Sequence, residues 1–201
     1  MLPRFRRTLA LKILVTVGLA IFMLFHARAT QQTPPAQSND HVSRMARYLQ
    51  NGRFDDALEE GRLALNGDPE NPFILNQIAI VYLTRAGKEP AYREKWVHEA
   101  IGYIEHSLRT SSKTDPKALL DIVLAARSLE IAGDLSVEKC TYYRRAADAL
   151  ENHSPPLKDD KVVMGGHVVS LAPVIQQKKT VLAHLKKKMA DARCDGGETT
   201  R

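Results

Sequence analysis

The stretch RYLQNGRFDDALEEGRLALNGDP, residues 47–69, decides the fold of this chain. Gly52 separates two segments with helical periodicity, and a glycine there permits a tight turn between helices. The small side chains of Ala57 and Ala64 let two helices approach closely. Pro69 ends the second helix because proline lacks an N–H and clashes with the preceding turn. The stretch therefore predicts two helices packed as a hairpin.

The same pattern of helix, short turn and helix continues along the body of the chain. Asn71 and Asp115 are helix-capping residues, and each precedes a proline, whose fixed φ suits a first helical turn. Residues 97–108 repeat apolar side chains every three or four positions, as one buried stripe requires. No run of alternating β-branched residues is long enough to indicate a sheet. We therefore expect an all-α body.

Six positions of the opening stretch fall at the spacing of the tetratricopeptide (TPR) repeat signature: Tyr48, Gly52, Phe54, Ala57, Ala64 and Pro69. A second unit is similar at Leu75, Ile78, Ala79, Tyr82, Ala100 and Ile104. About nine extra residues, including 87–92, interrupt its period of about 34 residues. A third, looser unit has Ile122, Ala126, Leu129, Gly133 and Ala147, with Cys140 where a small residue is usual. The chain thus resembles a short TPR array of about three units over residues 39–151.

This resemblance implies a concave groove lined by the first helix of each pair. By the same resemblance, six residues would face that groove: Asn76, Gln77, Ile80, Thr84, Arg127 and Glu130. A mixture of amides and apolar side chains suits a peptide or a helix better than a small charged metabolite. The competing interpretation is that these residues are ordinary exposed helix surface.

The N-terminal residues 1–29 follow the order of a secretory signal. A basic start precedes the apolar run 13–25 and the small-residue site Ala27-Arg28-Ala29. The segment is either a cleaved signal peptide or an uncleaved signal anchor, and both deliver the rest of the chain across a membrane. We expect an extracytoplasmic protein, periplasmic or secreted, in which the polar, turn-rich residues 30–38 form a linker.

The C-terminal part contains a loop, a helix and a short tail. Residues 152–170 form a loop containing proline and glycine, residues 171–193 an amphipathic helix, and residues 194–201 the tail. The lysine-rich helix either caps the last repeat with a polar face or contacts anionic lipid or an acidic partner. Cys140 and Cys194 either pair as a disulfide in an oxidising compartment or remain a buried and a free thiol.

The formal charge of +6 is concentrated at the N-terminus. Residues 1–29 hold five basic and no acidic residues, so the rest of the chain holds 24 basic and 23 acidic ones. A nearly neutral body offers no electrostatic case for binding phosphates. We therefore expect no nucleic-acid partner.

No catalytic, cofactor-binding or metal-binding residue is predicted. His98 and His106 would point about 80° apart on one helix, a poor arrangement for two ligands of one metal. Gly165-Gly166 lacks the length and the lysine of a phosphate loop, and no serine stands in a nucleophile elbow.

The sequence therefore predicts an exported adaptor or scaffold that binds a protein or peptide and is not an enzyme. One alternative is an assembly factor held at the membrane by its N-terminal segment. Another is an enzyme with an unrecognised constellation, which loss of a measurable activity on altering His98 or His106, without loss of folding, would support. Self-association of the short array stays open.

Overall fold

The computed structural model describes residues 36–157, 160–164 and 167–194. The predicted signal segment, residues 30–35 of the predicted linker and residues 195–201 of the tail lie outside this described part. Contacts group Pro34–Val162 and Val168–Arg201 into one compact unit, which holds every described helix. The expected all-α class is confirmed, since helices dominate and only two short strands accompany them.

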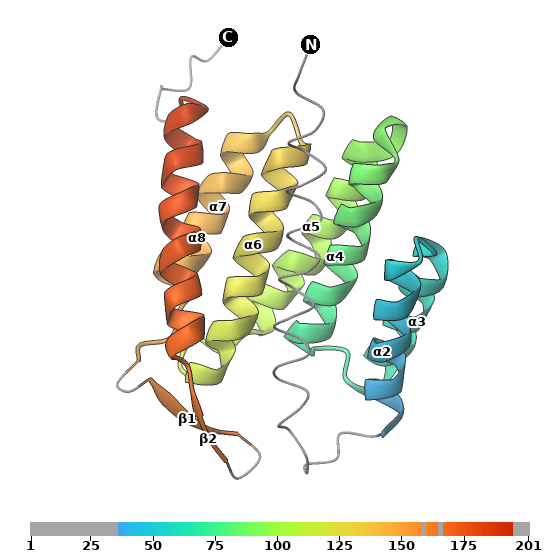
Figure 1. The fold of residues 1–201 in the computed structure, drawn as a ribbon, viewed down its shortest axis with the longest axis horizontal. Coiled ribbons are helices and arrows are strands. Elements are labelled where there is room, and N and C mark those ends of the chain that lie inside the picture. Colours follow the sequence, from blue (N-terminus) through green and yellow to red (C-terminus); the bar gives the residue numbers. More distant parts are fainter. Residues whose placement is uncertain (1–35, 158–159, 165–166, 195–201) are drawn as a thin grey trace. The chain divides into compact units, whose positions relative to one another are not determined.

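Seven α-helices lie in the described part: α2 (Ala36–Gln50), α3 (Phe54–Gly67), α4 (Pro72–Lys88), α5 (Arg93–Thr110), α6 (Leu119–Leu135), α7 (Lys139–Asn152) and α8 (Ala172–Asp191). The first six pack as consecutive pairs, α2 with α3, α4 with α5 and α6 with α7 (Figure 1). Helix α4 also contacts α3 and α6, while α8 packs against α7 and α6. Helix α2 begins at Ala36, inside the segment predicted to be linker.

The first helical pair follows the local chemistry of its sequence. Gly52 has φ of 71°, a conformation that glycine adopts without steric cost, as the prediction required. Ala57 and Ala64 are fully buried. A further close approach occurs at Gly61, where an added Cβ would lie 2.7 Å from Cγ1 of Ile78 on α4. The small residues of α3 thus set its distance from both neighbouring helices.

The two predicted capping residues also lie at helix starts. Oδ1 of Asn71 accepts a hydrogen bond of 3.2 Å from the Ile74 N–H at the start of α4. Oδ1 of Asp115 accepts one of 2.9 Å from the Lys117 N–H, but this bond starts a 3₁₀ turn, η2 (Pro116–Ala118). Helix α6 begins only after that turn.

The inserted residues between α4 and α5 are fixed by a charged and aromatic cluster. They include the 3₁₀ turn η1 (Pro90–Tyr92), which directly precedes α5. Arg85 donates to Asp55 of α3 at 2.7 Å and to Glu89 at 3.0 Å. Trp96, the single tryptophan of the chain, donates from Nε1 to Glu89 at 2.9 Å, and the Arg85 guanidinium lies 4.1 Å from the centre of its ring. The insert is therefore tied to the first pair of helices.

Part of the predicted loop at 152–170 forms a β-hairpin. Strand β1 (Lys161–Met164) pairs with strand β2 (His167–Ser170) in a two-stranded sheet. Each strand contains two consecutive valines, Val162-Val163 and Val168-Val169, and this β-branched residue favours the strand conformation. Val168 is 70% exposed, so the hairpin displays apolar surface to solvent.

Helix α8 is attached to the helices before it by three kinds of contact. Val174, Val181 and Leu185 bury its apolar stripe. Cys194, just beyond the helix, forms a disulfide with Cys140 in the first turn of α7. Ion pairs complete the attachment and are described below. In the described part of the chain, no helix is both long and apolar enough to span a membrane.

Candidate functional site

Two of the six predicted groove residues are buried inside the helical packing. The Asn76 side chain has no exposed surface, and its Nδ2 donates a hydrogen bond of 3.0 Å to the main-chain oxygen of Asp121 on α6. Glu130 is 4% exposed and pairs with Lys188 at 2.8 Å and with His184 at 2.9 Å, both on α8. Their predicted place in a groove is therefore corrected. Asn76 joins α4 to α6, and Glu130 is covered by α8.

The other four predicted residues retain partial exposure. Gln77, Ile80 and Thr84 of α4 are half-buried, as is Arg127 of α6. Thr84 donates through its hydroxyl to the main-chain oxygen of Ile80 at 2.8 Å, so this hydroxyl is already bonded within α4. Arg127 lies 3.5 Å from Glu130, so its charge is compensated within α6.

These four residues belong to two matching stripes, which we call the first-helix face. The face comprises Phe73, Gln77, Ile80 and Thr84 on α4 and Leu120, Leu124, Arg127 and Ile131 on α6, all half-buried. Each stripe has the same spacing of four, three and four residues, which places its members on one side of a helix. Because α4 and α6 pack against each other, the stripes belong to neighbouring helices. Five of the eight side chains are apolar.

Sequence reasoning missed the apolar members of this face. The sequence pattern alone does not distinguish four of them from the buried apolar residues of the same helices: Phe73, Leu120, Leu124 and Ile131. A signal was present, since α4 and α6 have apolar residues around more of their circumference than one buried stripe needs. Comparing the two helices at equal register would have identified the repeated stripe.

Asp121 borders the first-helix face and carries an uncompensated carboxylate. The residue is half-buried beside Leu120, and in the described part of the chain its carboxylate has no hydrogen bond or ion pair. Burial raises the pKa of Asp121 to about 6. Oδ1 of the adjacent Asn76 is buried and has no hydrogen-bond partner among the described residues. Two acceptors that lack donors therefore occur together where α4 meets α6.

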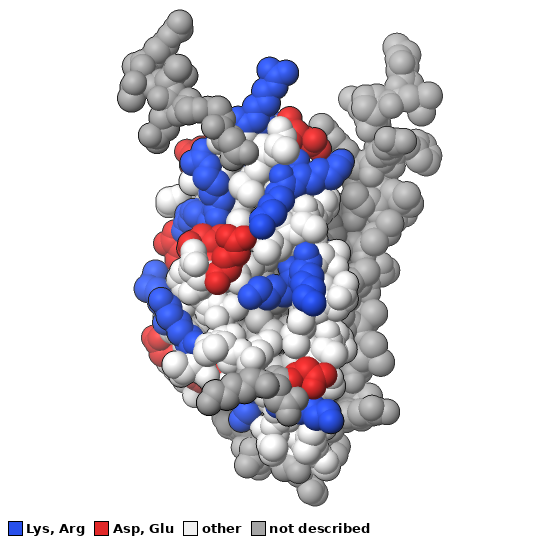
Figure 2. Space-filling model, turned by 90° about the vertical axis from the view of Figure 1, so that its left-hand side faces the viewer, with Lys and Arg blue, Asp and Glu red and all other residues white. Residues whose placement is uncertain are grey.

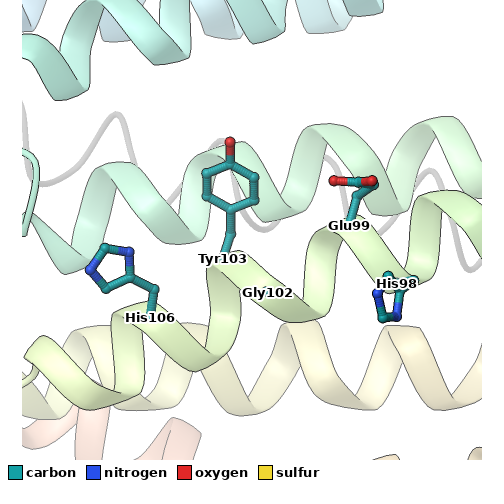
Figure 3. A pocket seen from close by; sticks show the side chains of 5 residues that line it. All are labelled: His98, Glu99, Gly102, Tyr103 and His106. Carbon is teal, nitrogen blue, oxygen red and sulfur yellow. The ribbon is translucent and has the colours of Figure 1, made fainter.

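A shallow hollow of about 350 Å³ lies on the outer surface of α5. Its lining consists of His98, Glu99, Gly102, Tyr103 and His106. Figure 3 shows Glu99 and Tyr103 pointing to one side of the helix and His98 to the other. His106 is engaged with Glu70 at 3.2 Å. The side chains do not converge on one point, and the described residues contain no group of three or more ligating side chains that could hold a metal ion.

Three of the five lysines of α8 form ion pairs with described residues. Lys188 contacts Glu130 and Asp134, Lys186 lies 3.2 Å from Glu151 of α7, and Lys187 lies 3.6 Å from Asp191. Basic side chains on this side of the molecule are interspersed with acidic ones (Figure 2). This arrangement favours a helix that binds its own neighbours over one that presents a cationic surface to lipid.

Comparison with protein-family models, with curated proteins and with solved structures found no match to this chain.

Proposed function

We propose that this chain is an exported, TPR-like interaction module that binds a protein or peptide on its first-helix face. The observation that carries the proposal is the pair of half-exposed, largely apolar stripes on two packed helices. Contiguous apolar surface on a folded protein commonly marks an interaction site. Among the described residues, α7 and α8 pack on other parts of α6, with α8 contacting Glu130 and Asp134, and the two stripes stay half-exposed.

The chemistry of the face suits a polypeptide ligand. Ile80, Leu124 and Ile131 can bury apolar side chains of a bound segment, at a gain of roughly 25 cal/mol for each Å² removed from water. The Gln77 amide has both a donor and an acceptor for the backbone or polar side chains of such a segment. These properties favour an adaptor or scaffold over an enzyme.

Export is part of the proposal and rests on two separate features. Residues 1–29 have the order of a secretory signal. The disulfide between Cys140 and Cys194 is of a kind that persists in oxidising compartments such as the periplasm or the extracellular space. A membrane-anchored assembly factor is the alternative, and it uses the same face. Membrane fractionation with sequencing of the mature N-terminus separates the two, because only the anchored form retains residues 1–29.

Site-specific photo-crosslinking in cells tests the face directly. A photoreactive residue is placed at Gln77 or Leu124, with Glu99 on the outer surface of α5 as the matched control. We expect one adduct of the same mass from both face positions, lost on Ile80→Glu and absent from the control. Adducts from Glu99 alone, or none from the face, would contradict the proposal.

A further inference from the structure

We infer that the segment bound on the first-helix face carries a lysine or arginine side chain that pairs with Asp121. This inference rests on the proposed function and specifies the chemistry of the ligand. It follows from the unpaired carboxylate of Asp121 beside the face, from the apolar side chains next to it, and from the way this chain treats its other acidic residues between helices.

Other acidic side chains between helices are paired with cations. Glu60 of α3 accepts hydrogen bonds from Arg44 of α2 at 3.0 Å and lies 2.6 Å from His41. Glu130 of α6 lies next to Arg127 and Lys188, which are both cationic, and next to His184. Asp121 differs from both, because its carboxylate has no such partner among the described residues. A buried or half-buried charge is costly unless it is paired, so the Asp121 carboxylate is available to pair with a cation of a ligand.

The surroundings of Asp121 strengthen the preference for a positive group. Leu120 and Leu124 lie within one turn of Asp121 on α6, and the α4 residue that contacts its main chain is the uncharged Asn76. Lys117, one turn earlier, is exposed and forms no ion pair with Asp121 among the described residues. A charge pair among apolar side chains is attenuated less than one in water. The apolar stem of a lysine or arginine can pack on the same side chains while its head reaches the carboxylate.

Asn76 fixes the place of Asp121 beside α4. Its buried Nδ2 donates to the Asp121 main-chain oxygen at 3.0 Å, which joins this turn of α6 to α4. Because the Asn76 side chain itself has no exposed surface, the half-buried Asp121 carboxylate is the acceptor of this pair that a bound side chain can reach. Arg127, the single cation of the face, is already paired with Glu130 and does not reverse the sign of this region.

Selection of peptides from a random displayed library tests the inference. The full chain, with its disulfide formed, is panned against a library of 16-residue peptides, in parallel with three variants. Asp121→Asn removes the charge, Leu124→Glu destroys the apolar face, and Glu99→Gln is the matched control on the outer surface of α5. We expect apolar peptides with a fixed basic position from the wild type and the control, and loss of that basic preference with Asp121→Asn.

A quantitative measurement then uses one selected peptide and its citrulline form, which replaces the guanidinium by an uncharged group of similar shape. We expect the citrulline peptide to bind the wild type about tenfold more weakly, in line with a charge-assisted hydrogen bond. The two peptides should bind Asp121→Asn with similar affinity. The advantage of the charged peptide should also shrink at pH 5, where the Asp121 carboxyl is largely protonated.

The outcomes separate the two proposals. Apolar peptides without a basic preference, lost on Leu124→Glu, would overturn the inference and leave the proposed function standing. Enrichment of acidic peptides would overturn it as well. If no enriched peptide depends on Leu124, both the inference and the first-helix face as a binding site are wrong.

Discussion

The ammonium group of Lys188 on α8 lies 2.8 Å from the carboxylate of Glu130 on α6, and it also lies 2.6 Å from Asp134. Because Glu130 is almost fully covered, this contact joins the C-terminal helix to the last helical pair at a buried point. The register of α8 is therefore set by charge as well as by its apolar stripe.

Replacing this lysine should loosen α8. Lys188→Met keeps the length of the side chain but leaves two carboxylates with one cation fewer, so we expect a loss of about 1–3 kcal/mol in the free energy of unfolding. Urea denaturation followed by far-UV circular dichroism measures it. The matched control is Lys187→Met, whose pair with Asp191 is 71% and 69% exposed and should contribute under about 0.5 kcal/mol. Equal losses in the two variants would contradict the assigned role.

The disulfide should add to the same attachment. It closes a separation of 54 residues between α7 and the end of α8. Restriction of the unfolded chain by a loop of that length stabilises the folded state by roughly 2–4 kcal/mol. Cys194→Ser should lower the urea midpoint accordingly, and a reductant should lower the wild type to the same value. The variant itself should not respond to reductant; a response would show that the reductant acts elsewhere.

Local chemistry explains which parts of the fold could be predicted. The turn at Gly52 and the cap at Asn71 depend on residues within a few positions of each other, and both lie where the sequence placed them. The hairpin had a readable signal as well, since Val162 and Val168 belong to β-branched runs on either side of a glycine pair. The runs are too short to predict strands by themselves, so the sequence predicts a loop there.

The errors at the candidate site have a different origin. Asn76 and Glu130 are buried by contacts with residues 45 and 54–58 positions further along the chain. A repeat pattern predicts which side of a helix packs against the partner helix of the same pair. It does not predict which residues a later helix such as α8 will cover. The position of α8 decides that Glu130 is covered and that Arg127 is half-exposed, and long-range packing of this kind is not encoded in periodicity.

Two helical glycines should respond to alanine with opposite signs. At Gly61 the new methyl group would lie 2.7 Å from Ile78 and 3.1 Å from Met45, so overpacking should exceed the gain in helix propensity and cost about 1–2 kcal/mol. At Gly102 no atom lies within 4 Å, so alanine should stabilise α5 by about 0.5–1 kcal/mol. Thermal unfolding of both variants checks the prediction, and a stabilising Gly61→Ala would mean that α3 and α4 are further apart than described.

Asp121 should make the stability of the protein depend on pH. Its folded-state pKa of about 6 lies above the value of 3.8 for a free aspartate, so folding favours the protonated form. The stabilisation due to this group is fully present below pH 3.8 and is lost as the pH rises through 6. Asp121→Asn removes the charge, so the variant should be more stable than the wild type at pH 7.5 by about 1–2 kcal/mol, a figure reduced for the partial exposure of the side chain.

The same pair of proteins compared at pH 4 should differ much less, because the wild-type carboxyl is then largely protonated in the folded state. Urea unfolding monitored by the fluorescence of Trp96 gives both values, and Asp191→Asn on the exposed end of α8 is the control that should show no such trend. A constant difference between wild type and Asp121→Asn across this range would mean that the substitution acts through packing and not through charge. A difference that disappears when a cationic peptide is added at pH 7.5 would instead place the missing counter-charge on the ligand, since only a bound cation removes the advantage of an uncharged side chain at this position.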